Sequence, residues 1–342
     1  MNKYTITITL FALAIFQFTA CEDDDIPLPQ SCEWEITQEP SVIDSCFERP
    51  RLFTGTIIEG DLVNDRRIRY FNNDLSSEDL LYFITKLESN GPAELYRLDL
   101  CKGEVTLLET LSTMSGSNLR MNASRKLVYP RFLQNVDLFD SNTLESTNIL
   151  SDIYVTDVAW VNDTSFICRQ DVPAGNDFEL RWIMYNLEGT LLDTLPAEFV
   201  KASNQNGSQI AFSTDNYDGE QDDRVIIYDF AQQATVAEHT FPSLSEFRSG
   251  FLLHWLDATR LLVYTGKLIA LYDLPTDELT ILLDHRECDN VVYGEVAAQL
   301  SDPNKFFYLL KENFYDENDE LKVSYDIIQY DLETQEEVKL VF

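Results

Sequence analysis

Short apolar runs that end in an aromatic or leucine residue followed by Asp or Asn recur along this 342-residue chain. Six such runs end at Asp99, Asp140, Asn186, Asp229, Asp273 and Asp331. Successive markers are 41 to 58 residues apart, and one four-stranded propeller blade takes about 40 to 50 residues. The pattern therefore predicts six repeated units, each about one blade long.

The same order of strands is expected around each marker: a first strand, a polar turn, an apolar second strand, a loop, the marker strand and a fourth strand. The second strands are predicted at 80–84, 126–129, 165–168, 209–212, 261–264 and 306–310. The fourth strands are predicted at 105–108, 191–195, 236–240, 279–283 and 338–341, with 145–150 the weakest. These elements predict an all-β chain, a six-bladed β-propeller of four-stranded antiparallel blades. Residues 52–58 also alternate like a strand, and we expect them to pair with the last blade and cover its edge.

The repeats resemble those of TolB-like six-bladed propellers, whose WD40-like units carry a polar turn, an apolar strand and a strand ending in Tyr-Asp. Residues 204–213 (NQNGSQIAFS) match that unit best, and the resemblance covers roughly residues 66–342. The resemblance implies the fold. It implies little about function, because this scaffold carries many unrelated activities.

The N-terminal residues predict a targeting signal. Residues 1–3 are basic and 4–18 are apolar, which is the length of a signal peptide. The sequence up to Cys21 resembles the lipobox of bacterial lipoproteins, which implies that Cys21 is lipidated. The acidic run Glu22, Asp23, Asp24 and Asp25 resembles a surface-export signal, and its alternative interpretation is a solvated tether. We therefore expect a leader at 1–20, a lipidated tether at 21–50 and the propeller at 51–342, held at the outer membrane and exposed on the cell surface.

The five cysteines after Cys21 fit an oxidising compartment. Cys32 and Cys46 are close enough in sequence to close a small loop in the tether. Cys101 and Cys288 are candidates to meet where the ring closes. Cys168 lies in an apolar strand pattern and is expected to be a buried free thiol.

Acidic residues far outnumber basic ones: 59 Asp and Glu against 25 Lys and Arg give a net charge of −34. Such a surface repels phosphate backbones, so the charge excludes nucleic acid as a partner. The three histidines are scattered, which argues against a zinc site, and residues 215–219 lack EF-hand spacing for calcium. No phosphate loop or nucleophile motif occurs, and we expect neither cofactor nor metal.

A candidate binding face comes from the loops between second and third strands, which are long at 170–178, 215–223 and 311–321. In a propeller these loops emerge together with the connections between blades, which add Arg248, His285 and Arg286 as the few cationic groups for an anionic ligand near the central channel. The candidate residues are Asp171, Asp177, Phe178, Asp215, Tyr217, Asp218, Asp222, Asp223, Arg248, His285, Arg286, Phe314, Tyr315 and Asp316. The alternative interpretation is a set of solvated hairpin tips.

Together these features predict a surface or outer-membrane lipoprotein whose propeller binds or scaffolds an envelope protein, without catalysis. One alternative is a carbohydrate- or peptide-binding accessory of a nutrient-uptake system. Another is a polymer-degrading enzyme that uses carboxylates from different blades.

Overall fold

The computed structural model describes residues 33–41, 67–72, 80–86, 93–111, 120–131, 134–174, 177–214, 223–241, 251–299, 302–315 and 321–341. The predicted leader, Cys21, the acidic run 22–25, the Cys32 and Cys46 pair and the strand at 52–58 lie outside these residues. Of the described residues, none forms a helix long and apolar enough to cross a membrane.

The described residues form six sheets, and the four strands of each blade come from one stretch of chain. Blade 1 contains β2 (Arg67–Asn72), β3 (Leu80–Lys86), β4 (Ala93–Asp99) and β5 (Glu104–Leu111). Blade 2 contains β6 (Arg120–Met121), β7 (Lys126–Arg131), β8 (Asn135–Asp140) and β9 (Glu145–Ser151). Blade 3 contains β10 (Val155–Asn162), β11 (Ser165–Ala174), β12 (Asp177–Asn186) and β13 (Leu191–Thr194).

The second half of the chain repeats this arrangement. Blade 4 contains β14 (Phe199–Asn206), β15 (Gln209–Thr214), β16 (Asp223–Asp229) and β17 (Ala234–Phe241). Blade 5 contains β18 (Leu252–Trp255), β19 (Arg260–Tyr264), β20 (Leu268–Asp273) and β21 (Glu278–Asp284). Blade 6 contains β22 (Val291–Ala298), β23 (Lys305–Tyr315), β24 (Leu321–Asp331) and β25 (Glu337–Val341).

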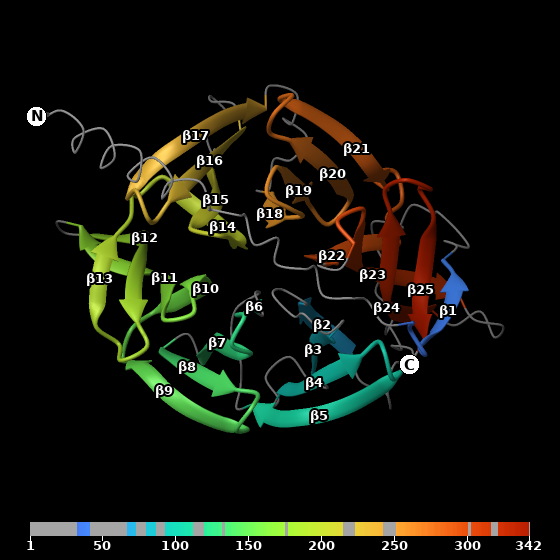
Figure 1. The fold of residues 1–342 in the computed structure, drawn as a ribbon, viewed down its shortest axis with the longest axis horizontal. Coiled ribbons are helices and arrows are strands. Elements are labelled where there is room, and N and C mark those ends of the chain that lie inside the picture. The colour runs from blue at the N-terminus through green and yellow to red at the C-terminus, as the bar shows by residue number, and fades with distance from the viewer. Residues whose placement is uncertain are drawn as a thin grey trace, which may run out of the picture.

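Within each blade the strands pair in chain order and antiparallel, with the first strand nearest the centre and the fourth at the perimeter (Figure 1). The predicted six-bladed propeller is therefore confirmed. The predicted second strands all fall within β3, β7, β11, β15, β19 and β23. The fourth strands are also confirmed, including the weakest at 145–150, except that β13 ends one residue earlier than predicted.

Each marker residue ends the third strand of its blade, and its side chain accepts a backbone N–H from the following turn. Asp140 accepts from Asn142 at 2.9 Å and Asp331 from Glu333 at 2.8 Å. Asn186 binds Thr190 in the same way at 2.8 Å. The remaining markers bind Lys102, Ala231 and Thr276. The recurring Asp or Asn is therefore a turn-capping side chain, which these two residue types provide best.

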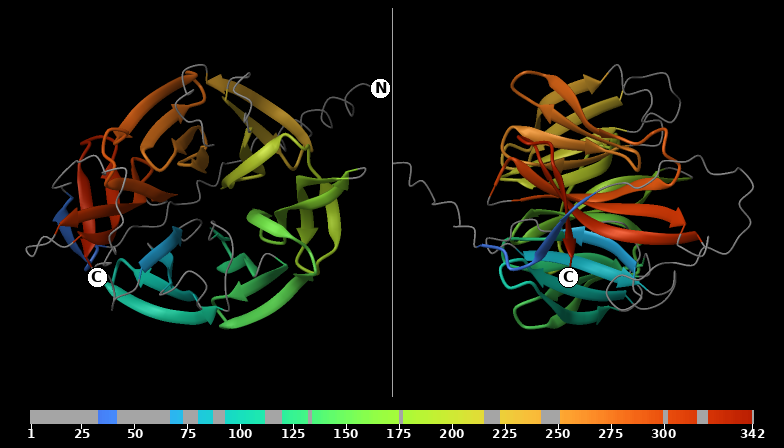
Figure 2. Two further views of the ribbon diagram at one scale, coloured as in Figure 1. Left: turned by 180° about the vertical axis from the view of Figure 1, so that it is seen from behind. Right: turned by 90° about the vertical axis from the view of Figure 1, so that its right-hand side faces the viewer.

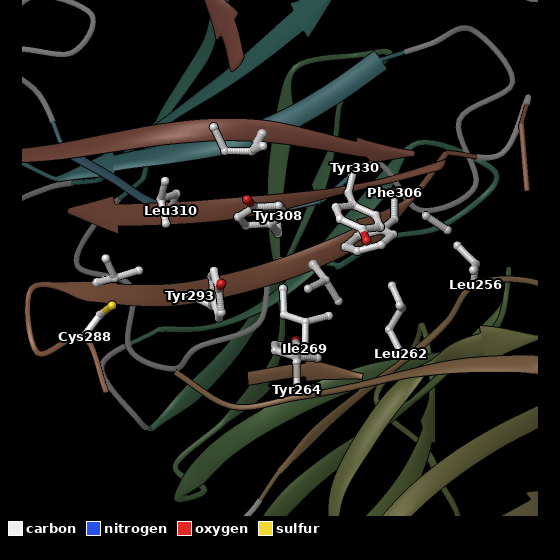
Figure 3. Packing of buried hydrophobic residues seen from close by; sticks show 14 residues of the cluster. Leu256, Leu262, Tyr264, Ile269, Cys288, Tyr293, Phe306, Tyr308, Leu310 and Tyr330 are labelled. Atoms are coloured by element: carbon white, nitrogen blue, oxygen red, sulfur yellow. The ribbon is translucent and has the colours of Figure 1, made fainter. Parts of the chain in front are cut away.

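The core is distributed between the blades. Middle strands such as β3 are buried on both faces, because a neighbouring blade packs on each side, and this is why they read as continuous apolar runs. Figure 3 shows the cluster in which Leu262 and Tyr264 of blade 5 pack against Tyr293 and Tyr308 of blade 6. An equivalent cluster joins blade 1 to blade 6 through Phe83 and Phe307, among others. Packing between the first and last blades thus closes the ring.

A further strand, β1 (Thr37–Pro40), pairs antiparallel with β25 and makes the sheet of blade 6 five-stranded. Trp34 stacks on Phe307 with ring centroids 5.9 Å apart, and Ile36 is buried in the cluster between blades 1 and 6. The edge of the last blade is thus covered by residues 37–40, which lie within the segment predicted as a tether.

Cys168 is a buried free thiol, as predicted, and burial raises its pKa well above the ordinary value. Cys101 and Cys288 are each disulfide-bonded. Cys101 lies in the turn between β4 and β5, whereas Cys288 lies in the connection from β21 to β22, on the opposite face of the disc. The two cysteines are therefore not bonded to each other, and the idea that they meet at ring closure is wrong.

Candidate functional site

The antiparallel blades give the propeller two distinct faces. The turns between first and second strands and between third and fourth strands lie on one face. The hairpins between second and third strands, together with the connections between blades, lie on the other, which we call the connection face. Those of the predicted binding residues that the structure describes belong to this second face.

On the connection face, the longest paired strands among the described residues form two hairpins. β11 and β12 have ten residues each and pair as far as Ala174 with Asp177, whereas β19 has five residues. β23 and β24 have eleven residues each and pair as far as Tyr315 with Leu321. They belong to blades 3 and 6, on opposite sides of the ring (Figure 1). The side view shows strands of blade 6 reaching beyond one side of the disc (Figure 2). The long segments predicted as loops in blades 3 and 6 therefore consist largely of extended, paired strands.

The blade 3 hairpin presents exposed aromatic and acidic side chains. Phe178 at its end is 70% exposed, and Asp171 is exposed nearby. Tyr154, which precedes β10, is 46% exposed, and its carbonyl oxygen accepts the N–H of Asp171 at 3.4 Å. Tyr154 was not predicted. The sequence feature that marks Tyr154 is an aromatic residue in a connection between two blades.

The other predicted residues are placed in part. The backbones of Asp177 and Asp223 begin β12 and β16, and those of Phe314 and Tyr315 end β23. Asp215, Tyr217, Asp218, Asp222, Arg248 and Asp316 lie outside the described residues.

His285 and Arg286 lie on the connection face, between β21 and β22, and both have partners within the protein. Arg286 forms a two-point ion pair with Asp284, with N–O distances of 2.8 and 2.5 Å. Burial lowers the pKa of His285 below its ordinary value, and Lys267 lowers it further while Asp284 opposes the shift. Burial raises the pKa of Tyr293, so its hydroxyl keeps its proton, and the hydroxyl oxygen lies 2.5 Å from His285 Nδ1. This geometry does not favour the expected role of the two residues as anion-binding cations.

The two remaining histidines also have partners within the fold. His254 Nε2 accepts the backbone N–H of Ala298 at 3.1 Å, which links the inner strands of blades 5 and 6. His239 Nδ1 lies 2.5 Å from the hydroxyl of Tyr272, which also donates to Asp277. Within the described ranges no group of three His, Cys, Asp or Glu residues is placed to hold a metal ion.

A polar pocket of about 410 Å³ lies between blades 1 and 2. Blade 1 contributes the end of β5, and blade 2 contributes strands β7, β8 and β9. The lining residues are Glu109, Thr110, Leu111, Tyr129, Arg131, Asp137, Ser146 and Asn148. The sequence did not single out these residues, because a pocket between two blades joins segments with no common spacing.

The buried carboxylate of Asp137 anchors one wall of this pocket. Its Oδ2 lies 2.7 Å from Arg131 Nε, and its Oδ1 accepts from Asn148 Nδ2 at 2.8 Å. Burial, followed by the nearby charge of Asp137, raises the pKa of Tyr129 to about 12. The phenol therefore stays protonated, and the pocket offers hydroxyl, amide and charged groups for binding a polar ligand.

Comparison with known proteins agrees with this architecture. No family model matches the chain, and no curated protein matches it. Among solved structures, the chain is similar to TolB from Acinetobacter baumannii, with a TM-score of 0.50 and 12% identity over 77% of this chain and 63% of that one. The chain thus spans less than two thirds of that TolB.

Two further structures illustrate the range of similar propellers. One is an acylaminoacyl peptidase from Pyrococcus horikoshii, with a TM-score of 0.49 and 13% identity over 81% of this chain and 46% of that one. The other is the C-terminal WD40 domain of Sif2, with a TM-score of 0.45 and 13% identity over 84% of this chain and 99% of that one. At such identities the likeness concerns the fold alone.

Proposed function

We propose that this protein is a lipid-anchored outer-membrane protein, exposed on the cell surface, whose propeller binds a protein partner through the connection face. The observation that carries the proposal is Phe178, a large aromatic side chain that is 70% exposed at the end of an extended hairpin. Aromatic side chains, Phe among them, are enriched in protein interfaces relative to the rest of the surface.

The arrangement of the two long hairpins supports the same proposal. They stand on opposite sides of the ring, so a partner seated over its centre contacts both (Figure 1). The net charge of −34 favours a partner with a basic surface, because complementary charge speeds association and excludes acidic competitors. The proposal includes no catalytic step, and the buried carboxylate of Asp137 has a structural role in holding Arg131 and Asn148.

The proposed location rests on the N-terminal sequence and on the cysteines. Cys21 with its preceding residues resembles a lipobox, and the acidic run 22–25 follows directly. The disulfides of Cys101 and Cys288 support an oxidising compartment outside the cytoplasm.

Partner binding is tested by crosslinking the lipidated protein in its native membrane and purifying it with the attached proteins. We expect one stoichiometric envelope protein, and Phe178→Ala is expected to weaken its binding by at least about tenfold. Leu192→Ala is the matched control, because Leu192 is 49% exposed but lies on the outer strand β13 of the same blade. Equal partner recovery from both variants would contradict the role of the hairpin.

Location is tested on intact cells by protease accessibility. Replacement of Cys21 by Ala is expected to release the protein from the membrane. Replacement of the acidic residues 22–25 by neutral ones is expected to leave the protein anchored in the membrane but protected from external protease. Protection of the wild-type protein would overturn surface exposure without affecting the partner experiment.

A further inference from the structure

The pocket between blades 1 and 2 is a second polar feature, separate from the two long hairpins. Its volume of about 410 Å³ is at the small end of the range for ligand pockets, roughly 300 to 1,000 Å³. Glu109 and Leu111 lie near the end of β5 and Arg131 ends β7, and both strand ends reach the connection face. The pocket is therefore within reach of a partner seated on that face.

The charges in the pocket do not cancel. Asp137 and Arg131 neutralise each other at 2.7 Å. Glu109, on the facing strand β5, takes part in no ion pair among the described residues, and its Oε1 accepts only the N–H of Thr110 at 3.0 Å. The pocket thus keeps one negative charge within a strongly acidic protein, so it attracts a cation.

The hydrogen-bonding groups in the pocket fit the same kind of ligand. The second oxygen of Glu109 and the hydroxyl oxygens of Thr110, Ser146 and Tyr129 are acceptors. A guanidinium or ammonium group brings several donors and no acceptor. The walls therefore match an organic cation in both charge and hydrogen bonding.

We infer that this pocket binds a guanidinium or primary ammonium group, presented as an Arg or Lys side chain by the protein partner. The inference rests on the proposed function for the source of the cation, and on the pocket alone for its chemistry. Glu109 supplies the charge, and the Arg131 and Asp137 pair holds the opposite wall in place.

The test uses the full chain and two probes of nearly equal shape, N-acetylarginine amide and its neutral analogue N-acetylcitrulline amide, titrated by calorimetry or NMR. We expect the arginine probe to bind about tenfold or more tightly than the citrulline probe, because hydrogen bonds to charged groups are the stronger kind. Added salt is expected to weaken the arginine probe alone. Equal binding of the two probes, or no binding, would overturn the inference.

Variants on one strand locate the site. Glu109→Gln is expected to weaken the arginine probe by about tenfold. Glu104→Gln is the matched control, since Glu104 is an exposed residue at the other end of β5 and does not line the pocket. If both variants bind like the wild type, the assignment to this pocket is wrong.

The same variants separate this inference from the proposed function. One outcome is that Phe178→Ala loses the partner, while Glu109→Gln leaves the affinity for the arginine probe unchanged. In that case the pocket assignment fails and the proposed function stands. The opposite outcome is that Glu109→Gln weakens binding of the arginine probe, while Phe178→Ala still binds the partner. In that case the hairpin proposal fails and the cation site stands.

Discussion

The Asp or Asn that ends the third strand of each blade is a structural residue. Asp229 shows its role most fully, because its Oδ1 accepts N–H groups from Ala231 and Gln232 and the hydroxyl of Ser208. The side chain thus satisfies backbone N–H groups of its own turn, and Ser208 of the neighbouring turn adds one further bond. The motif therefore recurs for a local physical reason and carries no catalytic meaning.

Two glycines in turns allow the cost of backbone strain to be compared with the cost of a steric clash. Gly189 and Gly207 both have positive φ, +76° and +60°. A Cβ at Gly189 would lie 2.7 Å from the carbonyl oxygen of Ile149, whereas one at Gly207 would meet nothing within 4 Å. We expect Gly207→Ala to cost about 1 kcal/mol of unfolding free energy and Gly189→Ala about 2 to 3 kcal/mol. Urea denaturation measures both, and equal losses would contradict the steric argument.

His285 makes stability depend on pH. Its folded-state pKa is lowered by burial, so the unfolded chain binds more protons just below the ordinary value of 6.5. Stability is therefore expected to fall as the pH drops from 7.5 to 5.5.

The variant His285→Gln isolates this effect. Its unfolding free energy, measured by urea denaturation across the same pH range, should change less than that of the wild type. Parallel losses in the two proteins would show that another group is responsible.

At the scale of elements, strand length decides which parts of the propeller project. Within blade 3, β11 and β12 continue four residue pairs past the pairing of Gln170 with Arg181. In blade 5 the chain turns within 265–267. From segment length alone the sequence predicted long segments here in blades 3, 4 and 6, of which residues 215–222 of blade 4 lie outside the described residues. That these segments are paired strands in blades 3 and 6 follows from the backbone pairing that the structure shows.

β1 is expected to protect the edge of blade 6. The double variant Trp34→Ala, Ile36→Ala removes the stack on Phe307 and a buried side chain, so β1 should detach from β25. Hydrogen exchange should then become faster in residues 337–341 and stay unchanged in β22. Glu39→Ala is the control, because Glu39 is exposed in β1. Unchanged exchange in β25 would show that β1 does not depend on these contacts.

At the scale of the whole molecule, a chain with a net charge of −34 folds into a ring whose stability comes from packing between blades. Repulsion between like charges opposes the compact state, and salt at about 0.1 M screens charges that are more than about 10 Å apart. We expect the melting temperature to rise when NaCl is increased from about 10 to 300 mM.

Differential scanning calorimetry in NaCl and in KCl checks this expectation, and both salts should act alike. A melting temperature that falls with salt would mean that surface ion pairs, such as that between Arg224 and Glu238, outweigh the general repulsion.

The sequence by itself determined the blade count, the positions of the second, third and fourth strands and the chemistry of the turns. These features are local, because an apolar run and the capping residue that follows it are separated by only a few residues in the sequence. It also pointed to Phe178 and to the long segment of blade 6, because loop length is visible along the chain.

Only the tertiary structure decided which residues meet. Glu109 faces Arg131 and Asp137 across two blades, Tyr293 binds His285, and residues 37–40 cover the last blade. Such contacts join segments with no common spacing, and they depend on how each blade is rotated against the next. The polar pocket and the pairing of the expected cations therefore became visible only once the ring was assembled.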